Sequence, residues 1–212
     1  NFLRNNENVF LEKGADGTGN ILSMTNFKQV TAKYKNCMDI ITGDGGFDFS
    51  SDFNNQELSI HELLFAQVAY AVCMQKCGGS FVLKMFDCFF KPTADILYIL
   101  SSFYEKMHII KPNTSRYANS EKYIVCVGFR FSNSAAYYSI FEKAMEKMLS
   151  RDPATTFISG FLKQSHIPLF LYSKIEECNA IIGQTQIENI HNLQLFYNLS
   201  KISVDHKIII IL

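Results

Sequence analysis

Apolar residues in the middle of the chain recur at the spacings of helices and strands. Between residues 57 and 76 they follow a helical period, which predicts an amphipathic helix ended by Gly78-Gly79. One side of this helix carries Ile60, Leu63, Leu64, Gln67, Tyr70, Ala71 and Met74. We expect a second helix from Pro92 to about Phe103, because proline is favoured in a first helical turn. A surface helix is expected at 134–149, with its packing face from residue 137 onward.

Short apolar runs predict strands at 39–43, 80–84, 107–110 and 121–129. Strands alternating with helices predict an α/β, Rossmann-like fold, with a mostly parallel sheet and helices on both faces. Residues 1–38 are polar and rich in turn formers, with a loop at 14–20. After Pro153 we expect two or three helices, including 186–200, as a helical C-terminal extension. In such sheets, ligands bind beyond the carboxyl ends of the strands.

The composition indicates one globular domain. The chain has 212 residues, 48% of them hydrophobic, and 20 basic residues balance 20 acidic ones. This balance argues against a protein that coats nucleic acid, since such domains carry a basic excess. No apolar run approaches the ~20 residues that span a bilayer, so no membrane partner is expected. The six cysteines are interpreted as core residues, and no metal ligand set is expected, because no second pair stands at zinc spacing.

Three polar residues stand at the ends of predicted strands. Asp44 follows the run 39–43 and precedes two glycines, so its alternative role is that of a turn residue. Lys84 stands in an apolar segment, which is unusual because burying an unpaired ammonium is costly. Its alternative is a strand-end lysine whose amine reaches water. Glu121 opens the last strand, and alone it predicts a solvated charge.

Taken together, these three residues indicate chemistry. Asp44 and Lys84 end neighbouring parallel strands, so their side chains should converge at one edge of the sheet. If the strand that begins at Glu121 is antiparallel, its start lies at the same edge. A partly desolvated lysine flanked by two carboxylates is a candidate general base.

Three segments resemble the FtsJ-like ribose 2′-O-methyltransferases. They are Asp39-Ile-Ile-Thr-Gly-Asp-Gly-Gly-Phe47, the run from Gly78 to Asp87, and the run from Lys111 to Cys126 with its Ser-Arg-x-x-Asn-Ser-Glu string. Within this family, the segments are most similar to enzymes that methylate the cap-proximal nucleotide of mRNA. The resemblance therefore implies a Rossmann-like methyltransferase fold and S-adenosyl-L-methionine as the cofactor.

The resemblance also assigns roles to residues. It implies that Asp44, Lys84 and Glu121 are the last three members of a Lys-Asp-Lys-Glu tetrad, with Lys84 deprotonating the ribose 2′-hydroxyl. It places the cofactor near Asn20, Ile21 and Asp44. It places the capped RNA near Asn54, Gln56, Arg116 and Asn119. No metal is needed for the in-line displacement.

The resemblance covers roughly residues 14 to 130. It implies that the family's first lysine and its Gly-rich cofactor loop lie upstream of these residues. We therefore expect 1–150 to be a methyltransferase domain without its N-terminal part, and 151–212 to be a helical C-terminal extension of the same domain. If the sequence is the whole polypeptide, we expect it to bind the cofactor weakly.

Two other functions stay open on the sequence alone. One is an FtsJ-like enzyme that acts on ribosomal or transfer RNA, and the other is a non-catalytic binding subunit with the methyltransferase fold. For the cap enzyme we expect capped mRNA as the partner, contact with RNA polymerase II or the capping machinery, and a nuclear location, or a cytoplasmic one for a viral protein.

Charge is unevenly distributed along the chain. From Asp39 to Glu62 there are six acidic residues and no basic one, which predicts an acidic rim. Basic and aromatic residues alternate later in the sequence, at Lys106, Lys111, Arg116 and Lys122 beside Tyr104, Tyr117 and Tyr123. This mixture suits a single RNA strand held by phosphate contacts and base stacking, and its alternative is an ordinary solvated loop.

Overall fold

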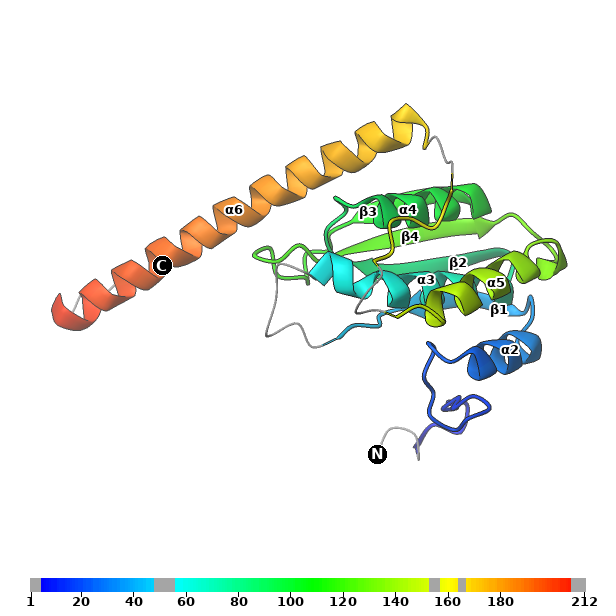
Figure 1. The fold of residues 1–212 in the computed structure, drawn as a ribbon. Coiled ribbons are helices and arrows are strands. Elements are labelled where there is room, and N and C mark those ends of the chain that lie inside the picture. Colours follow the sequence, from blue (N-terminus) through cyan, green and yellow to red (C-terminus); the bar gives the residue numbers. More distant parts are fainter. Residues whose placement is uncertain (1–4, 48–55, 153–156, 164–166, 207–212) are drawn as a thin grey trace.

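The computed structural model describes residues 5–47, 56–152, 157–163 and 167–206. A four-stranded sheet forms its centre, with β1 (Met38–Gly43), β2 (Gln75–Met85), β4 (Lys122–Phe129) and β3 (Tyr104–Ile110) side by side in that order (Figure 1). β1 and β2 are parallel, whereas β4 is antiparallel to both β2 and β3. Three strands thus share a direction and β4 opposes them. The predicted strands and α/β order are confirmed.

The two faces of the sheet are unequally covered. Phe81, Leu83, Ile124 and Cys126 point to one face and are fully buried. Two helices, α3 (Gln56–Met74) and α4 (Lys91–Phe103), pack on strands and on each other, and so form one layer over this face. The other face of the sheet, which we call the open face, carries the alternate residues of the strands. They are half-buried or exposed: Ile40, Thr42, Val82, Lys84, Tyr123, Val125, Val127 and His108. Within the described residues, the expectation of helices on both faces is therefore wrong.

The junction between α3 and β2 is abrupt. The helix ends at Met74, and the strand begins at Gln75, whose side chain is fully buried. Gln75 Nε2 donates to Met38 O at 2.8 Å, and its Oε1 accepts from the Tyr104 hydroxyl at 3.0 Å. A Cβ on Gly79 would lie 2.3 Å from Gln75 Nε2. The prediction that Gly78-Gly79 ends the helix is wrong, because both glycines lie within β2, where Gly79 leaves room for this amide.

The cysteines do not all lie in the core. Cys73, Cys88 and Cys126 are buried, and burial raises the pKa of each thiol to about 12. Cys37 and Cys77 are exposed, which contradicts the interpretation of all six as core residues. Cys77 belongs to β2 and not to α3, so it does not share a helix face with Cys73.

A helix that the sequence pattern did not predict, α2 (Met24–Lys33), precedes β1. The Ser23 hydroxyl caps it by accepting from the backbone N–H of Asn26. Phe27 is fully buried and meets the ring of Tyr70 edge-on, with the centroids 5.1 Å apart. Helix α2 has few apolar residues, so it is hard to recognise from the sequence. Phe27 nevertheless packs it against α3.

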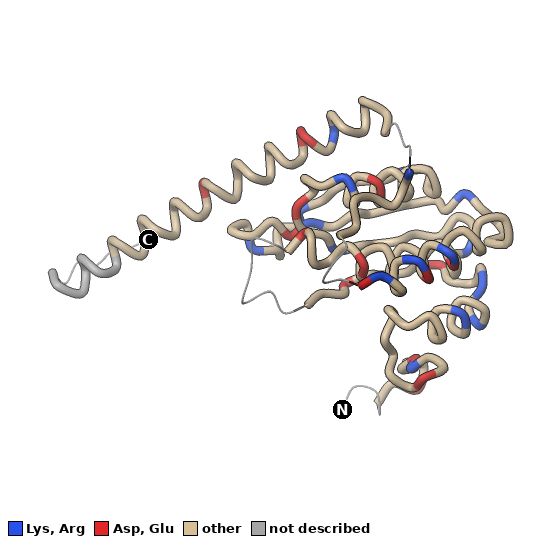
Figure 2. Tube along the Cα trace, in the orientation of Figure 1, with Lys and Arg blue, Asp and Glu red and all other residues tan. Residues whose placement is uncertain are grey.

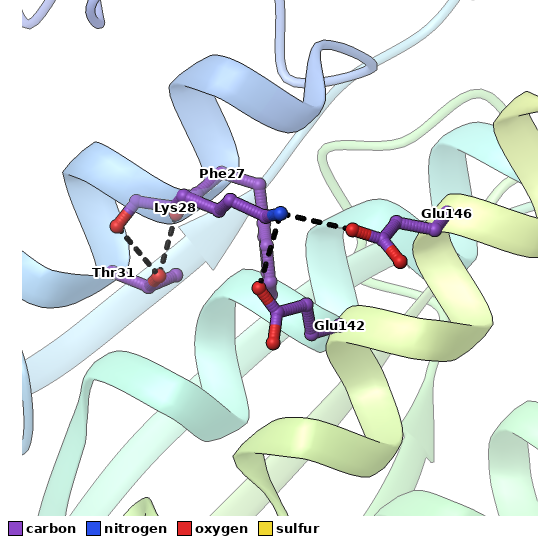
Figure 3. A network of polar contacts seen from close by, with 5 residues as sticks. All are labelled: Phe27, Lys28, Thr31, Glu142 and Glu146. Atoms are coloured by element: carbon purple, nitrogen blue, oxygen red, sulfur yellow. Dashed lines mark hydrogen bonds and ion pairs between the residues drawn. The ribbon is translucent and has the colours of Figure 1, made fainter.

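Charged residues gather on α2 and on α5 (Tyr138–Leu149), which lie next to each other (Figure 2). Lys28 Nζ lies 3.3 Å from Glu142 Oε1 and 2.9 Å from Glu146 Oε1, so one ammonium joins two successive turns of α5 to α2 (Figure 3). The other side of α5 buries Phe141, Met145 and Met148, which confirms the predicted packing face.

In the described residues after Pro153 there is one helix, α6 (Leu169–His206), where two or three helices were expected. Asn179 Nδ2 donates to Cys88 O at 2.9 Å, and Ile175 is buried, so the first half of α6 is attached to the domain. The later part of α6 extends past the sheet (Figure 1), and its residues 188–199 include one charged residue, Glu188 (Figure 2). Among the described helices, none is long and apolar enough to cross a membrane.

Candidate active site

Lys84 and Asp44 form an ion pair at one end of the sheet. Lys84 Nζ lies 2.9 Å from Asp44 Oδ1 and donates to Asp44 O at 3.0 Å. Their side chains are 16% and 72% exposed, respectively. Lys84 lies on the open face, whereas Leu83 and Met85 on either side of it point into the core. This alternation explains how a lysine can occupy an apolar segment without being buried in the core.

The turn that carries Asp44 is held by a buried amide. Gln67, on α3, accepts a hydrogen bond from Gly45 N–H at 2.9 Å through Oε1 and donates from Nε2 to Leu63 O at 3.2 Å. A Cβ on Gly43 would lie 2.9 Å from Gln67 Oε1, and one on Gly45 would lie 3.0 Å from it. The glycines around Asp44 therefore leave room for Gln67, which fixes the backbone that carries the carboxylate.

Glu121 lies at the same end of the sheet. It directly precedes β4, in which Tyr123 pairs with Lys84 of β2 on the open face. Glu121 Oε1 accepts hydrogen bonds from Ser115 Oγ at 2.8 Å and from the Tyr123 hydroxyl at 3.4 Å. The pKa of Tyr123 is raised by partial burial and then by the charges of Glu121 and Asp44. The charges of Glu121 and Asp44 thus both raise the pKa of Tyr123, the residue that pairs with Lys84. Because β4 is antiparallel to β2, Asp44, Lys84 and Glu121 lie at the same end of the sheet.

The loop at 14–20 is held by hydrogen bonds of its own and by Asn26 of α2. Asp16 is its centre, since it accepts from the Thr18 hydroxyl, the Thr18 N–H and Asn26 Nδ2. These bonds, above all the one from the Thr18 hydroxyl, hold the pKa of Asp16 far below its usual range. Asn20 is exposed, and Ile21 packs against the core. The bonds of Asn20 stay within this segment, since its Oδ1 accepts from Leu22 N–H at 3.0 Å and its carbonyl oxygen accepts from Asn26 Nδ2 at 3.0 Å. Figure 1 shows the segment leading into α2 below the sheet. The role of Asn20 and Ile21 in cofactor binding stays a prediction.

The residues predicted to hold RNA are also spread out. Arg116 is exposed on the β3–β4 loop, and Asn119 is half-buried beside it. Gln56 is the first residue of α3, and Asn54 lies outside the described residues. Only the first two therefore share one loop with Glu121.

Two of the seven basic and aromatic residues predicted to meet RNA, Lys122 and Tyr104, are buried. Lys122 is fully buried and donates to Phe86 O, and the buried Tyr104 hydroxyl donates to Gln75. Lys111 Nζ is also bonded within the protein. Of the basic residues among these seven, Lys106 and Arg116 are exposed. The prediction that these basic and aromatic residues hold an RNA strand is therefore wrong for Lys122 and Tyr104, whose side chains are buried.

Part of the predicted acidic rim is structural too. Glu57 is buried and accepts from the N–H groups of Phe89 and Phe90 and from the Thr93 hydroxyl, which caps the N-terminus of α4. Glu62 pairs with Arg151. Of the acidic residues of this rim that the structure describes, Asp44 is the one that is exposed and paired with Lys84.

A cavity of about 880 Å³ opens between β3, α4 and α6. Its apolar lining includes Met107, Ile109, Leu171 and Ile175, whereas neither Asp44, Lys84 nor Glu121 lines it. The candidate site is therefore defined by side-chain geometry and not by this cavity. Among the described residues, no three His, Cys, Asp or Glu side chains are placed to hold a metal ion.

Comparison with known proteins decides the family. The sequence pattern of the FtsJ-like methyltransferases matches residues 2–129, more than half of the chain. The chain belongs to the FtsJ-like methyltransferase family. The resemblance seen in the sequence and the expected Rossmann-like methyltransferase fold with a C-terminal helical extension are thereby confirmed.

Several curated members of this family are similar to the chain. A cap-specific mRNA (nucleoside-2′-O-)-methyltransferase 1 of Trypanosoma brucei brucei is 31% identical over 84% of this chain and 48% of its own length. A cap-specific mRNA (nucleoside-2′-O-)-methyltransferase 2 of Mus musculus is 30% identical over 86% of this chain and 24% of its own. The chain thus spans less than half the length of these relatives.

Among solved structures, a Plasmodium falciparum protein described as a ribosomal RNA methyltransferase is 24% identical. The match covers 57% of this chain and 62% of that protein, with a TM-score of 0.39. 

The sequence did not predict a part for two residues that bond to the backbone around the candidate site, Gln67 and Lys111. The sequence did mark Gln67 as unusual, since it was the polar residue on the apolar side of the predicted helix 57–76. Lys111 had only its place before Pro112, and it was grouped with the exposed basic residues. Both act through hydrogen bonds to backbone groups, which sequence spacing does not show.

Proposed function

We propose that the chain carries the catalytic residues of a ribose 2′-O-methyltransferase that modifies the cap-proximal nucleotide of mRNA. The observation that supports this most is the Lys84–Asp44 ion pair, held at the strand ends on the open face of the sheet with Glu121 at the same edge. On this proposal the protein binds the capped 5′ end of mRNA and acts in the nucleus.

Lys84 is the general base of the proposed reaction. Its Nζ lies on the open face, where a ribose hydroxyl can approach it, and it accepts the proton of the 2′-hydroxyl as that oxygen becomes a nucleophile. Asp44 fixes the amine through two contacts, from its carboxylate and its carbonyl oxygen.

The residues around Asp44 also fit S-adenosyl-L-methionine. The Asp44 carboxylate is 72% exposed beside a glycine turn, so it has oxygen surface to offer a cationic ligand while it holds Lys84. When bound, the cofactor supplies an electrophilic methyl group. Asp44 contributes to its binding, and Asn20 and Ile21 are further candidates from the sequence.

Methyl transfer to three RNAs tests the proposal. The full-length protein that contains this chain is given labelled cofactor and a short capped RNA, the same RNA without a cap, or a folded ribosomal or transfer RNA fragment. Transfer to the 2′-oxygen of the capped RNA alone is expected. Transfer only to the folded RNA would assign the site to ribosomal or transfer RNA, and no transfer to any RNA would reject a catalytic role.

A further inference from the structure

Lys111 closes the loop that joins β3 to β4. It directly follows Ile110, the last residue of β3, and its Nζ donates to Asn119 O at 2.9 Å, to Asn119 Oδ1 at 2.9 Å and to Glu121 O at 2.7 Å. An ammonium has three donors, so these three acceptors satisfy it. The amine also lies 3.4 Å from Ser115 Oγ.

The other hydrogen bonds of this loop are mostly local. Ser115 N–H donates to Pro112 O at 2.9 Å, and the Tyr117 hydroxyl donates to Asn113 Oδ1 at 2.8 Å. Such bonds shape short turns, but they do not tie the beginning of the loop to its end. Lys111 does so, together with the bond from Ser115 to Glu121. The pairing of β4 with β2 sets where Glu121 lies along the sheet, and Lys111 adds a bond that holds its backbone to the start of the loop.

We infer that Lys111 is a positioning residue, which holds Glu121 at the catalytic edge and orients Asn119 for RNA. Because Lys111 occupies Asn119 Oδ1, the part of the Asn119 amide left for a ligand is the NH₂ group, a donor. The neighbouring Arg116 is also purely a donor and is exposed. The loop thus presents donors to a ligand rich in acceptors, such as the sugar–phosphate backbone of RNA. This inference rests on the proposed function.

The competing role for Lys111 is a direct contact with a phosphate. Its three bonds to the protein oppose that role, because the amine would have to give up backbone oxygens that are already well placed. Partial burial lowers the pKa of Lys111, as expected for an amine that lies inside the loop and not in the solvent. The two roles predict different responses to salt, since each phosphate contact adds to the dependence of RNA affinity on salt concentration.

The test compares Lys111→Met and Lys111→Arg in the full-length protein with the wild type. Hydrogen exchange without ligands reports on the loop amides at 112–121, which should exchange at least tenfold faster in Lys111→Met and nearly as in the wild type in Lys111→Arg. Far-UV circular dichroism checks that both variants fold. If Lys111→Met does not fold, Ser115→Ala removes the second link across the loop and serves the same measurement.

Two functional readouts complete the test. For Lys111→Met, we expect kcat on capped RNA to fall at least tenfold, the affinity for the cofactor to stay within twofold, and the slope of log K for RNA against log salt to stay unchanged. Unchanged loop exchange, or a salt slope smaller by about one, would overturn the inference. If the wild type transfers no methyl group, the proposed function fails, whereas hydrogen exchange and salt dependence still decide what Lys111 does.

Discussion

Gln67 accepts a 2.9 Å hydrogen bond from the backbone N–H of Gly45, the residue after Asp44. This bond connects a buried side chain of α3 to the turn that carries the carboxylate of the candidate site. Asp44 in turn pairs with Lys84. A series of contacts therefore connects α3 in the core, through the glycine turn, to the amine of Lys84 on the open face. The site is therefore set by residues that do not themselves face a substrate.

Gln67→Leu should weaken both stability and activity. The substitution leaves the N–H of Gly45 without its acceptor in a partly buried position, which costs about 1–3 kcal/mol of unfolding free energy. Methyl transfer should fall more steeply than the affinity for RNA, because Asp44 loses its fixed position. Chemical denaturation and single-turnover kinetics measure the two effects. Gln184→Leu, at an exposed position on α6, is the control, and an equal loss in it would contradict this role.

Lys84→Met should abolish methyl transfer and leave the fold intact, because Lys84 is on the open face and outside the core. We expect a loss of at least about a hundredfold in kcat, the range supplied by general-base catalysis, with cofactor affinity largely kept. Lys76→Met is the matched control. Lys76 belongs to the same strand and also pairs with an aspartate at 2.9 Å, but at the other end of β2. Activity of Lys84→Met within tenfold of the wild type would exclude the lysine as the base.

Much of this arrangement could be predicted from the sequence. Strands and helices followed from apolar spacing, and Asp44, Lys84 and Glu121 stood at strand ends that the sheet brings to one edge. Spacing could not show which side chains bond to backbone groups, as Gln75 does at the α3–β2 junction. It also could not separate an exposed lysine from Lys122, whose ammonium is buried against a carbonyl oxygen.

The same limit explains the errors at both ends of the chain. Helix α2 has little apolar periodicity, and it is held by Phe27 in the core and by Lys28 between two glutamates of α5. Helix α6 was divided into shorter helices because its apolar residues follow no single face, and many of them are exposed. Helix α2 thus depends on contacts with distant segments, and much of α6 lacks such contacts within the described residues. The local pattern of apolar residues shows neither.

Arg116 and Lys122 should differ in their effects on RNA binding. Arg116→Gln removes an exposed donor, so we expect weaker binding and a salt slope smaller by about one. Lys122→Met removes a buried amine that donates to Phe86 O, so the salt slope should not change even if stability does. Filter binding of capped RNA at several salt concentrations measures both. A reduced slope in Lys122→Met would show that this amine reaches the phosphates after all.

His61 should make the fold less stable as the pH falls. It is buried beside Thr93, whose hydroxyl donates to Glu57, so His61 Nε2 is the donor in its 3.1 Å bond to Thr93 Oγ1. Burial lowers the pKa of His61 to about 4, whereas in the unfolded chain the pKa is about 6.5. Between these values the unfolded chain binds a proton that the folded protein does not, so protons favour unfolding. Stability is therefore fully present above about pH 6.5 and is progressively lost toward pH 4.

Urea denaturation at pH 7.0, 6.0, 5.0 and 4.5 measures this effect. We expect the free energy of unfolding to decrease by on the order of 2 kcal/mol over this range from His61 alone. His61→Gln provides the reference, because glutamine does not titrate and can still donate to Thr93. The difference between wild type and variant removes the contribution of carboxylates such as Glu12, whose pKa is lowered to about 2 by Lys33 and which therefore also affects stability in acid. An unchanged difference across the pH range would show that His61 accepts a proton as readily in the folded protein as in the unfolded chain.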